Sequence, residues 1–228
     1  MPYLRSLARQ CAYFADWTEA DVAQNSLSQY IGQVTGAPQV ETMNDCTPSA
    51  ACSTRSNNIF RQARRADLVA VNYVEGPSEP CSAVGNAAKH IPALYMWGGD
   101  DRASCREQVR PISDLKAGAL PNFAFVTPTL CNDGHDCAND VVDAWARDHI
   151  QPVIESAAYH AGKVAVFVWY DEDHPVPNLW ITPTAKPGAR TLEGAGYAGT
   201  LAAWESMLGL PCIAFACAAP DMRAAANS

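Results

Sequence analysis

One stretch constrains the fold more than any other, Lys163–Asp173, which reads KVAVFVWYDED. An unbroken apolar run, Val164–Tyr170, is followed at once by three acids at positions 171 to 173. A short apolar run without alternation is typical of a strand buried on both faces, as in a parallel sheet. Ligands of open α/β sheets bind just outside the carboxyl ends of the strands. The stretch therefore predicts a central strand that ends at a ligand site.

Asp171 and Glu172 are the candidate metal ligands in this stretch. Carboxylates so close together repel each other unless a cation or a proton lies between them. Their hard oxygens suit one divalent ion, either Mg²⁺, Mn²⁺, Ca²⁺ or Zn²⁺. Solvated acids in a turn are the alternative, and the motif by itself leaves both interpretations open. Asp173 is expected to face water, because neighbouring side chains alternate in direction at a strand end.

Strand-like and helix-like segments alternate along the 228 residues. The expected strands are Leu68–Val74, Phe123–Thr127, Lys163–Tyr170 and Asn178–Pro183, and the expected helices are Pro2–Phe14, Asn25–Thr35, Asn58–Arg65, Asn139–Tyr159 and Leu201–Leu208. This alternation predicts an α/β fold, a three-layer sandwich with a mainly parallel sheet. The length fits a single domain over residues 1–228. The segment Glu75–Leu120 is expected to be mostly irregular, held by disulfides over an active face.

Charge and hydropathy exclude several classes of partner. The formal net charge is −8, and no basic stripe or Lys/Arg cluster is present. A net acidic chain is a poor candidate for wrapping nucleic acid or anionic lipid. The longest apolar runs are far too short to span a bilayer, so no transmembrane segment is expected.

The spacing of the nine cysteines predicts local disulfides. Three close pairs are Cys46 with Cys52, Cys131 with Cys137, and Cys212 with Cys217; Cys81 and Cys105 form a plausible fourth, and Cys11 is left over. A zinc site is the rival explanation, but the chain has no CxxC pair and its thiols are dispersed. Disulfides favour an oxidising compartment, secreted or cell-envelope. The opening MPYLRSLARQ has no charged start followed by an apolar region, so the sequence shown has no signal peptide, and we expect either that a leader has been removed or that the natural start differs.

Two further residues are candidates for chemistry, and each has a structural alternative. His135 lies in the loop CNDGHDC after a predicted strand, where it fits a ligand or a general acid. The alternative is an Asx-rich turn with Gly134 at positive φ, but the position at a strand end favours function. Ser26 begins a predicted helix, where free N–H groups and the helix dipole favour an anion. An N-cap without chemistry is the commoner role of such a serine, and from the residues by themselves it is the favoured one.

The segments PNFAFVTPTLCNDGHDC, DAWARDHIQPVIES, VAVFVWYDE, ITPTAKPGA and WESMLGLP follow one another along the chain. In this order they resemble the phosphoesterase family of bacterial phospholipases C and secreted acid phosphatases, within the alkaline phosphatase superfamily. The resemblance extends from Pro2 to the C-terminus. It implies an alkaline-phosphatase-like α/β/α sandwich, one divalent metal and a serine nucleophile that becomes phosphorylated.

The resemblance also implies a role for each candidate residue. The acidic pair after the central strand falls on Asp171 and Glu172, which would hold the metal together with Ser26, the nucleophile. The histidine of the NDxHDC loop falls on His135. The histidine of a KHxP segment falls on His90, which otherwise reads as a packed or hydrogen-bonded histidine. The two histidines would bind phosphoryl oxygens or protonate the leaving alcohol.

Several positions depart from the family pattern. The family's first strand ends in a Glu-Asn pair upstream of the PYL segment, and this chain begins at that segment, so we expect a longer gene product to be the active form. His-Pro before the serine is replaced by Gln24 and Asn25, and Pro-Asn after the leucine by Ser28 and Gln29. A histidine near the C-terminus is replaced by Tyr197.

These observations lead to one hypothesis and two rivals. The hypothesis is a secreted, metal-dependent phosphoesterase that acts on a small-molecule or lipid phosphate ester. A catalytically silent, disulfide-stabilised binding protein on the same scaffold is the first rival, motivated by the missing Glu-Asn pair and Tyr197. A metal-independent serine esterase is the second, and the lack of a GxSxG elbow around Ser26 counts against it.

Overall fold

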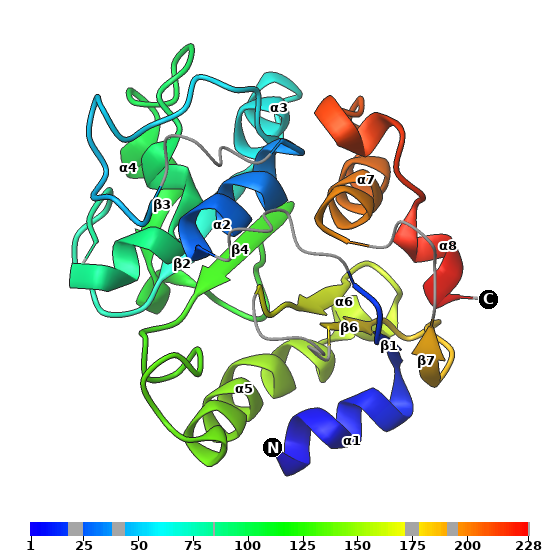
Figure 1. The fold of residues 1–228 in the computed structure, drawn as a ribbon. Helices are drawn as coiled ribbons and strands as arrows, with labels where there is room; N and C mark the ends of the chain where they lie inside the picture. The colour runs from blue at the N-terminus through cyan, green and yellow to red at the C-terminus, as the bar shows by residue number, and fades with distance from the viewer. Residues whose placement is uncertain (18–24, 38–43, 84, 172–177, 191–195, 228) are drawn as a thin grey trace.

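The computed structural model describes residues 1–17, 25–37, 44–83, 85–171, 178–190 and 196–227. In this part of the chain the strands form two sheets (Figure 1). One has the order β3-β2-β4, with strands Val109–Pro111, Ala70–Val74 and Phe123–Thr127 all parallel. The other has the order β5-β6-β1-β7, with strands Val166–Val168, Asn178–Ile181, Ala12–Phe14 and Gly188–Arg190. Only its β1–β7 pairing is parallel. The fold is therefore α/β, as predicted, with a parallel and a mixed sheet.

Helices pack around both sheets (Figure 1). The α-helices are α1 (Pro2–Gln10), α2 (Ser26–Thr35), α3 (Ile59–Arg65), α4 (Cys105–Gln108), α5 (Asn139–Ile154), α6 (Ala157–His160), α7 (Tyr197–Leu208) and α8 (Met222–Ala226). Short 3₁₀ segments are η1 (Gly85–His90), η2 (Pro92–Tyr95), η3 (Ile112–Asp114) and η4 (Ala214–Cys217). Helix α2 contacts α7 and η1, α3 contacts β2, and α1 contacts α5. No described helix is both long and apolar enough to cross a membrane.

Helix α2 is the element on which the candidate site is built, and every one of its residues is buried. The Asn25 side chain caps it by accepting a hydrogen bond from the Ser28 N–H, at 3.0 Å. Gly36 ends it in the left-handed conformation, with φ of 70°. Both signals are local, which is why the sequence predicts this helix correctly. Because the largest apolar cluster surrounds α2, including Leu27 and Ile31, the start of the helix is held in place.

The predicted central strand is present but is not central. Strand β5 lies at one edge of the mixed sheet and runs antiparallel to β6. Val166 and Val168 pack against one apolar cluster, whereas Phe167 and Trp169 pack against another on the opposite face. The apolar run therefore reflects apolar contacts on both faces, but every residue of β5 is only partly buried, so the predicted full burial is not found. The expected parallel direction and central position are wrong, because hydrophobic pattern reports what covers a strand and not which strands pair with it.

The predicted helix Pro2–Phe14 is also too long. Helix α1 ends at Gln10, Cys11 is extended, and Ala12–Phe14 forms β1. Strand β1 pairs with β6 on one side and β7 on the other, and these long-range hydrogen bonds outweigh a local helical pattern. The start of α1 is held on α5, because the Asp143 carboxylate accepts the Tyr3 and Leu4 N–H groups at 2.8 and 2.9 Å.

The four predicted disulfides are confirmed. Their pairs are Cys46–Cys52, Cys81–Cys105, Cys131–Cys137 and Cys212–Cys217, and Cys11 is a buried free thiol. The segment Glu75–Leu120, predicted to be mostly irregular, contains η1, η2, α4, β3 and η3. Strand β3 forms there because it pairs with β2, and this pairing cannot be predicted from the local sequence.

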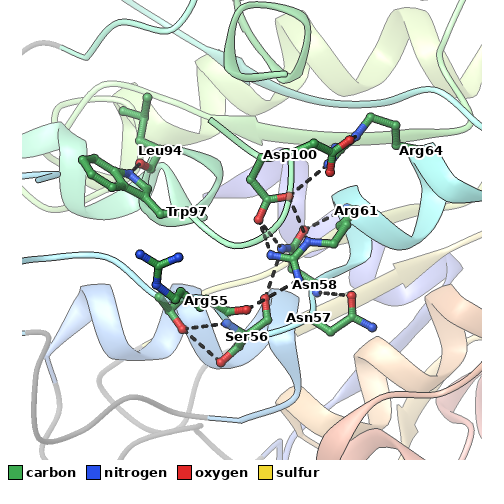
Figure 2. Close-up of polar contacts among 11 residues, drawn as sticks. Arg55, Ser56, Asn57, Asn58, Arg61, Arg64, Leu94, Trp97 and Asp100 are labelled. Atoms are coloured by element: carbon green, nitrogen blue, oxygen red, sulfur yellow. Dashed lines mark hydrogen bonds and ion pairs between the residues drawn. The ribbon is translucent and has the colours of Figure 1, made fainter. Parts of the chain in front are cut away.

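A buried ionic network joins α3 to the loop before α4 (Figure 2). The Asp101 side chain, 2% exposed as a residue, accepts hydrogen bonds from Arg61 Nε at 3.1 Å and Nη2 at 2.5 Å. It also accepts from Arg64 Nη2 at 3.0 Å and from Asn58 Nδ2 at 3.2 Å. Asp100 pairs with Arg64 nearer the surface. Figure 2 shows the arginines of α3 pointing toward the loop that carries Asp100. The network fixes the loop on the helix.

Glu205 is a second buried ionisable group, on α7, and its residue is 1% exposed. Burial raises the pKa of its carboxyl group from 4.5 to about 7, and neither carboxyl oxygen has a hydrogen-bond partner among the described residues. Between these two pH values the folded protein keeps a proton that the unfolded chain releases. The free energy of unfolding therefore decreases as pH rises through this range. Below pH 4.5 the carboxyl group is protonated in both the folded and the unfolded chain, so its ionisation has no effect on stability there.

Replacing Glu205 by glutamine should remove this pH dependence. We compare the free energy of unfolding of the variant with that of the wild type at each pH. We expect this difference to be about 3 kcal/mol more in favour of the variant at pH 8 than at pH 4. Urea unfolding of both proteins at the two pH values measures the difference. Glu107→Gln, at an exposed position on α4, is the matched control and should show no such gain. An equal effect of Glu205→Gln at both pH values would contradict the assignment.

Candidate active site

Ser26 is the first residue of α2 and is 4% exposed. The structure assigns the N-cap to Asn25, so the capping role that the sequence favoured for Ser26 is wrong. The next residue, Leu27, donates its N–H to the Asp45 carboxylate, with 2.9 Å between Leu27 N and Oδ1. A helix start with free N–H groups and a positive dipole end attracts an anion. A carboxylate occupies this position beside Ser26.

His90 ends η1 and is held from three directions. It is 4% exposed, and its Nδ1 lies 2.8 Å from Asp133 Oδ2. Its ring stacks on Tyr30 of α2, with 4.8 Å between centroids and an interplanar angle of 18°. Its carbonyl oxygen accepts a hydrogen bond from the Thr127 hydroxyl, at 2.8 Å, where β4 ends. A carboxylate only accepts, so Nδ1 is the donor to Asp133.

His135 lies on the exposed side of the same loop, and its side chain is 46% exposed. Its N–H donates to Asp133 Oδ1 at 2.9 Å, and its Nδ1 lies 2.7 Å from Asp136 Oδ1. Its Nε2 lies 3.3 Å from the Lys89 ammonium, which also contacts Asp45 Oδ2 at 3.2 Å. The centroids of the two histidine rings, His90 and His135, are 6.2 Å apart.

These contacts join distant segments into one cluster. His135 is linked through Lys89 and Asp45 to the N–H of Leu27, the neighbour of Ser26. His90 is linked to the same loop through Asp133. The start of α2, the end of η1 and the loop after β4 therefore meet. Ser26, His90 and His135, far apart in the sequence, belong to these three segments.

Of the two acidic metal ligands expected at the end of β5, the structure describes one. Asp171 is half-buried, and Glu172 lies outside the described residues. Trp169, two residues before Asp171, contacts the ring of Tyr30 at 4.6 Å between centroids, which connects this end of the strand to α2. Within the described ranges no three His, Cys, Asp or Glu side chains form a group that could hold a metal ion. Because Glu172 lies outside these ranges, the expected ligand set of Asp171, Glu172 and Ser26 stays a prediction.

Comparison with known proteins identifies the family. The model of the phosphoesterase family matches residues 25–197. This chain belongs to the phosphoesterase family. The matched range contains all five candidate residues, Ser26, His90, His135, Asp171 and Glu172.

Three fungal phosphatases are similar to parts of this phosphoesterase family member. A probable acid phosphatase of Kluyveromyces lactis is 33% identical over 61 residues, which are 27% of this chain and 14% of that protein. An acid phosphatase of Aspergillus fumigatus is 30% identical over 90 residues, 37% of this chain and 20% of that protein. A phosphate-repressible acid phosphatase of Penicillium chrysogenum is 28% identical over 88 residues, which are 37% of this chain and 21% of that protein. The chain thus matches about a fifth or less of these relatives' lengths.

Two cavities flank the CNDGHDC loop of this phosphoesterase family member. The larger, of about 440 Å³, is lined by Asn132, Val141, Trp145 and three acidic or small residues of α5. The smaller, of about 300 Å³, lies between the loop and Glu75, Gly76 and Ala87. Neither is lined by Ser26 or His90. The site is therefore defined by the side-chain contacts and not by either cavity.

Sequence reasoning missed three polar residues of this region. Asp133 orients His90, Lys89 bridges His135 and Asp45, and Glu75 binds the start of the loop. Asp133 had a signal, since it is an acid within the loop already singled out. Lys89 had a signal only as the lysine of the KHxP segment. Glu75 had none, because its partners lie 54 or more residues away in the sequence.

Proposed function

We propose that the protein containing this chain hydrolyses phosphate esters through a phosphoserine formed on Ser26. The observation that supports this most strongly is the hydrogen bond between buried His90 and half-buried Asp133, with the His90 ring stacked on Tyr30 of the helix that Ser26 begins. Membership of the phosphoesterase family gives independent support. An acid phosphatase activity would agree with the names of the three relatives.

In this proposal the phosphoryl group binds at the start of α2. The helix dipole favours its negative charge, and the Leu27 N–H would donate to a phosphoryl oxygen. The Lys89 ammonium, whose side chain is 14% exposed, adds a positive charge nearby. Asp45 now occupies the Leu27 N–H and the ammonium, so its carboxylate would have to exchange with the incoming anion.

The reaction would proceed in two displacements. The Ser26 oxygen attacks phosphorus and loses its proton, the P–O bond to the alcohol breaks, and the alcohol leaves with a proton. Water then attacks the phosphorylated serine and restores its hydroxyl, which releases inorganic phosphate from a monoester substrate or a phosphate monoester from a diester substrate. Splitting one difficult step into two easier ones is the general advantage of covalent catalysis.

His90 is better suited than His135 to move the proton. Because its Nδ1 donates to Asp133, the opposite nitrogen, Nε2, is the one that would meet the substrate. The His135 Nε2 faces the Lys89 ammonium, which only donates, so in this arrangement it accepts and carries no proton. His135 is assigned to binding a phosphoryl oxygen after the phosphoryl group replaces the ammonium contact, a role in which Nε2 takes up a proton from solvent and donates it in the hydrogen bond.

A divalent ion held by Asp171, Glu172 and Ser26 is a separate part of the proposal. Such an ion would polarise the phosphoryl group and lower the pKa of the serine hydroxyl. The support is the carboxylate chemistry of the sequence, since Glu172 lies outside the described residues. The finer fold assignment, an alkaline-phosphatase-like α/β/α sandwich, is likewise proposed from the resemblance. Four disulfides support a secreted or cell-envelope location.

Turnover by the full-length protein tests the proposal. We expect hydrolysis of a chromogenic phosphate monoester or diester, lost after exhaustive chelation and restored by Zn²⁺, Ca²⁺, Mg²⁺ or Mn²⁺. Hydrolysis that persists after complete metal removal would exclude only the metal requirement. If neither ester is cleaved although inorganic phosphate binds, the catalytically silent binding protein is the correct description.

A further inference from the structure

Glu75, which directly follows β2, is bonded as heavily as any side chain near the site. Its Oε2 accepts the Thr129 N–H at 2.9 Å, and its Oε1 accepts the Trp145 indole N–H at 3.1 Å. The Asn132 amide Nδ2 lies 3.0 and 2.9 Å from the two oxygens. Burial raises the pKa of the Glu75 carboxyl group, but these donors lower it more, so its net shift is downward. The side chain is an ionised acceptor at the carboxyl end of the parallel sheet.

The donors to Glu75 lie around the loop that carries the candidate chemistry. Thr129 begins this loop, and Asn132 directly precedes Asp133, the residue that binds His90. Trp145 comes from α5, which follows the loop. Glu75 therefore ties the loop to the end of β2 on one side and to α5 on the other.

The disulfide of the loop cannot replace this anchor. Cys131 and Cys137 join the two ends of the loop to each other. The hydrogen bond from Asp136 N to Leu130 O, at 2.8 Å, is likewise internal to it. Both contacts make the loop rigid, but neither sets its position relative to the sheet. The Glu75 carboxylate contacts the loop from outside, at two points.

We propose that Glu75 is a positioning residue for the phosphoesterase reaction, which holds Asn132 and thereby keeps the Asp133 carboxylate at hydrogen-bond distance from His90. This inference rests on the proposed function. Glu75 acts through Asp133 and does not touch the substrate. Its loss would let the Asp133 carboxylate move away from the His90 Nδ1–H, which would leave the imidazole without a fixed orientation.

The expected result of Glu75→Gln is a slower reaction with nearly unchanged binding. The amide is close in size to the carboxylate, but its NH₂ group would face N–H donors of the loop. A misplacement of about 1 Å in catalytic geometry can cost about 10²-fold in rate. We expect kcat to fall about 10- to 100-fold, KM to change less than about threefold, and the kcat–pH profile to shift.

Kinetics of the full-length protein with a chromogenic phosphate ester make the first test. Glu79→Gln, which changes the same charge at an exposed position, is the matched control and should behave as the wild type. The double variant Glu75→Gln/Asp133→Asn should be no slower than Asp133→Asn, because Glu75 acts through Asp133. Wild-type kcat in folded Glu75→Gln, or losses that multiply in the double variant, would overturn the proposal.

NMR of the His90 ring gives a second test that does not depend on turnover. In the wild type we expect a hydrogen-bonded Nδ1–H resonance. In Glu75→Gln we expect this resonance to be lost or broadened, while the ring signals of the exposed His160 on α6 stay unchanged. An unchanged Nδ1–H resonance would refute the positioning role. If Glu75→Gln does not fold, Asn132→Ala, which removes one donor and buries no new charge, is measured in the same two ways. A wild type without any turnover would contradict the proposed function, and the NMR result would still decide the role of Glu75.

Discussion

Replacing Ser26 by alanine should lower kcat for phosphate-ester hydrolysis by roughly four orders of magnitude or more, as is usual when a covalent nucleophile is removed. The protein should remain folded. The N-cap of α2 is Asn25, whose hydrogen bond to the Ser28 N–H does not involve the Ser26 hydroxyl. Alanine also fits a buried helical position, since it has a high helix propensity and a smaller side chain.

Ser28→Ala is the matched control for this experiment. Ser28 lies on the same helix, is fully buried, and its hydroxyl makes no hydrogen bond within the described part of the chain. We expect Ser28→Ala to keep wild-type activity. Acid quenching during turnover, followed by mass spectrometry, should locate phosphate on the peptide that contains Ser26. Phosphate on a different residue, or near-normal turnover by Ser26→Ala, would exclude the proposed nucleophile.

Replacing Asp101 by alanine should lower the free energy of unfolding by about 3–5 kcal/mol. The substitution leaves the Arg61 guanidinium, whose side chain is 7% exposed, without its buried counter-charge. It also removes the acceptor for Asn58 Nδ2, from the residue that caps α3. A buried charge without a partner costs far more than the intact pair contributes, so the effect on stability should be severe.

Asp100→Ala is the control for this prediction, because Asp100 also pairs with Arg64 but its side chain is 59% exposed. Its effect on stability should be much smaller. Urea unfolding measures the free energy of unfolding of both variants, and we expect their m values to equal that of the wild type. The double variant Arg61→Met/Asp101→Leu should recover part of the loss, since it buries no charge. Equal losses for Asp100→Ala and Asp101→Ala would show that the Arg61–Asp101 pair is not decisive.

Local signals account for what could be predicted about the fold. Each of these signals lies within a few residues: the Gly36 end of α2, the apolar segments of β2 and β4, and the close cysteine pairs such as Cys46–Cys52 and Cys131–Cys137. Nothing local separated Ala12–Phe14 from the helix before it, because β1 exists only through its pairings with β6 and β7. The same reason explains why β5 lies at a sheet edge when its composition indicated a central strand.

The candidate site divides in the same way. The sequence determined a serine at a helix start, a histidine in a disulfide-closed loop and an acid after an apolar strand, because these are properties of residue type and spacing. That His90 binds Asp133, 43 residues away, is decided by the tertiary structure, as is the bond between Glu75 and Asn132, 57 residues away. Hydrogen bonds between such distant groups depend on how strands and loops are brought together in space. Neither hydrophobic periodicity nor motif spacing encodes that arrangement.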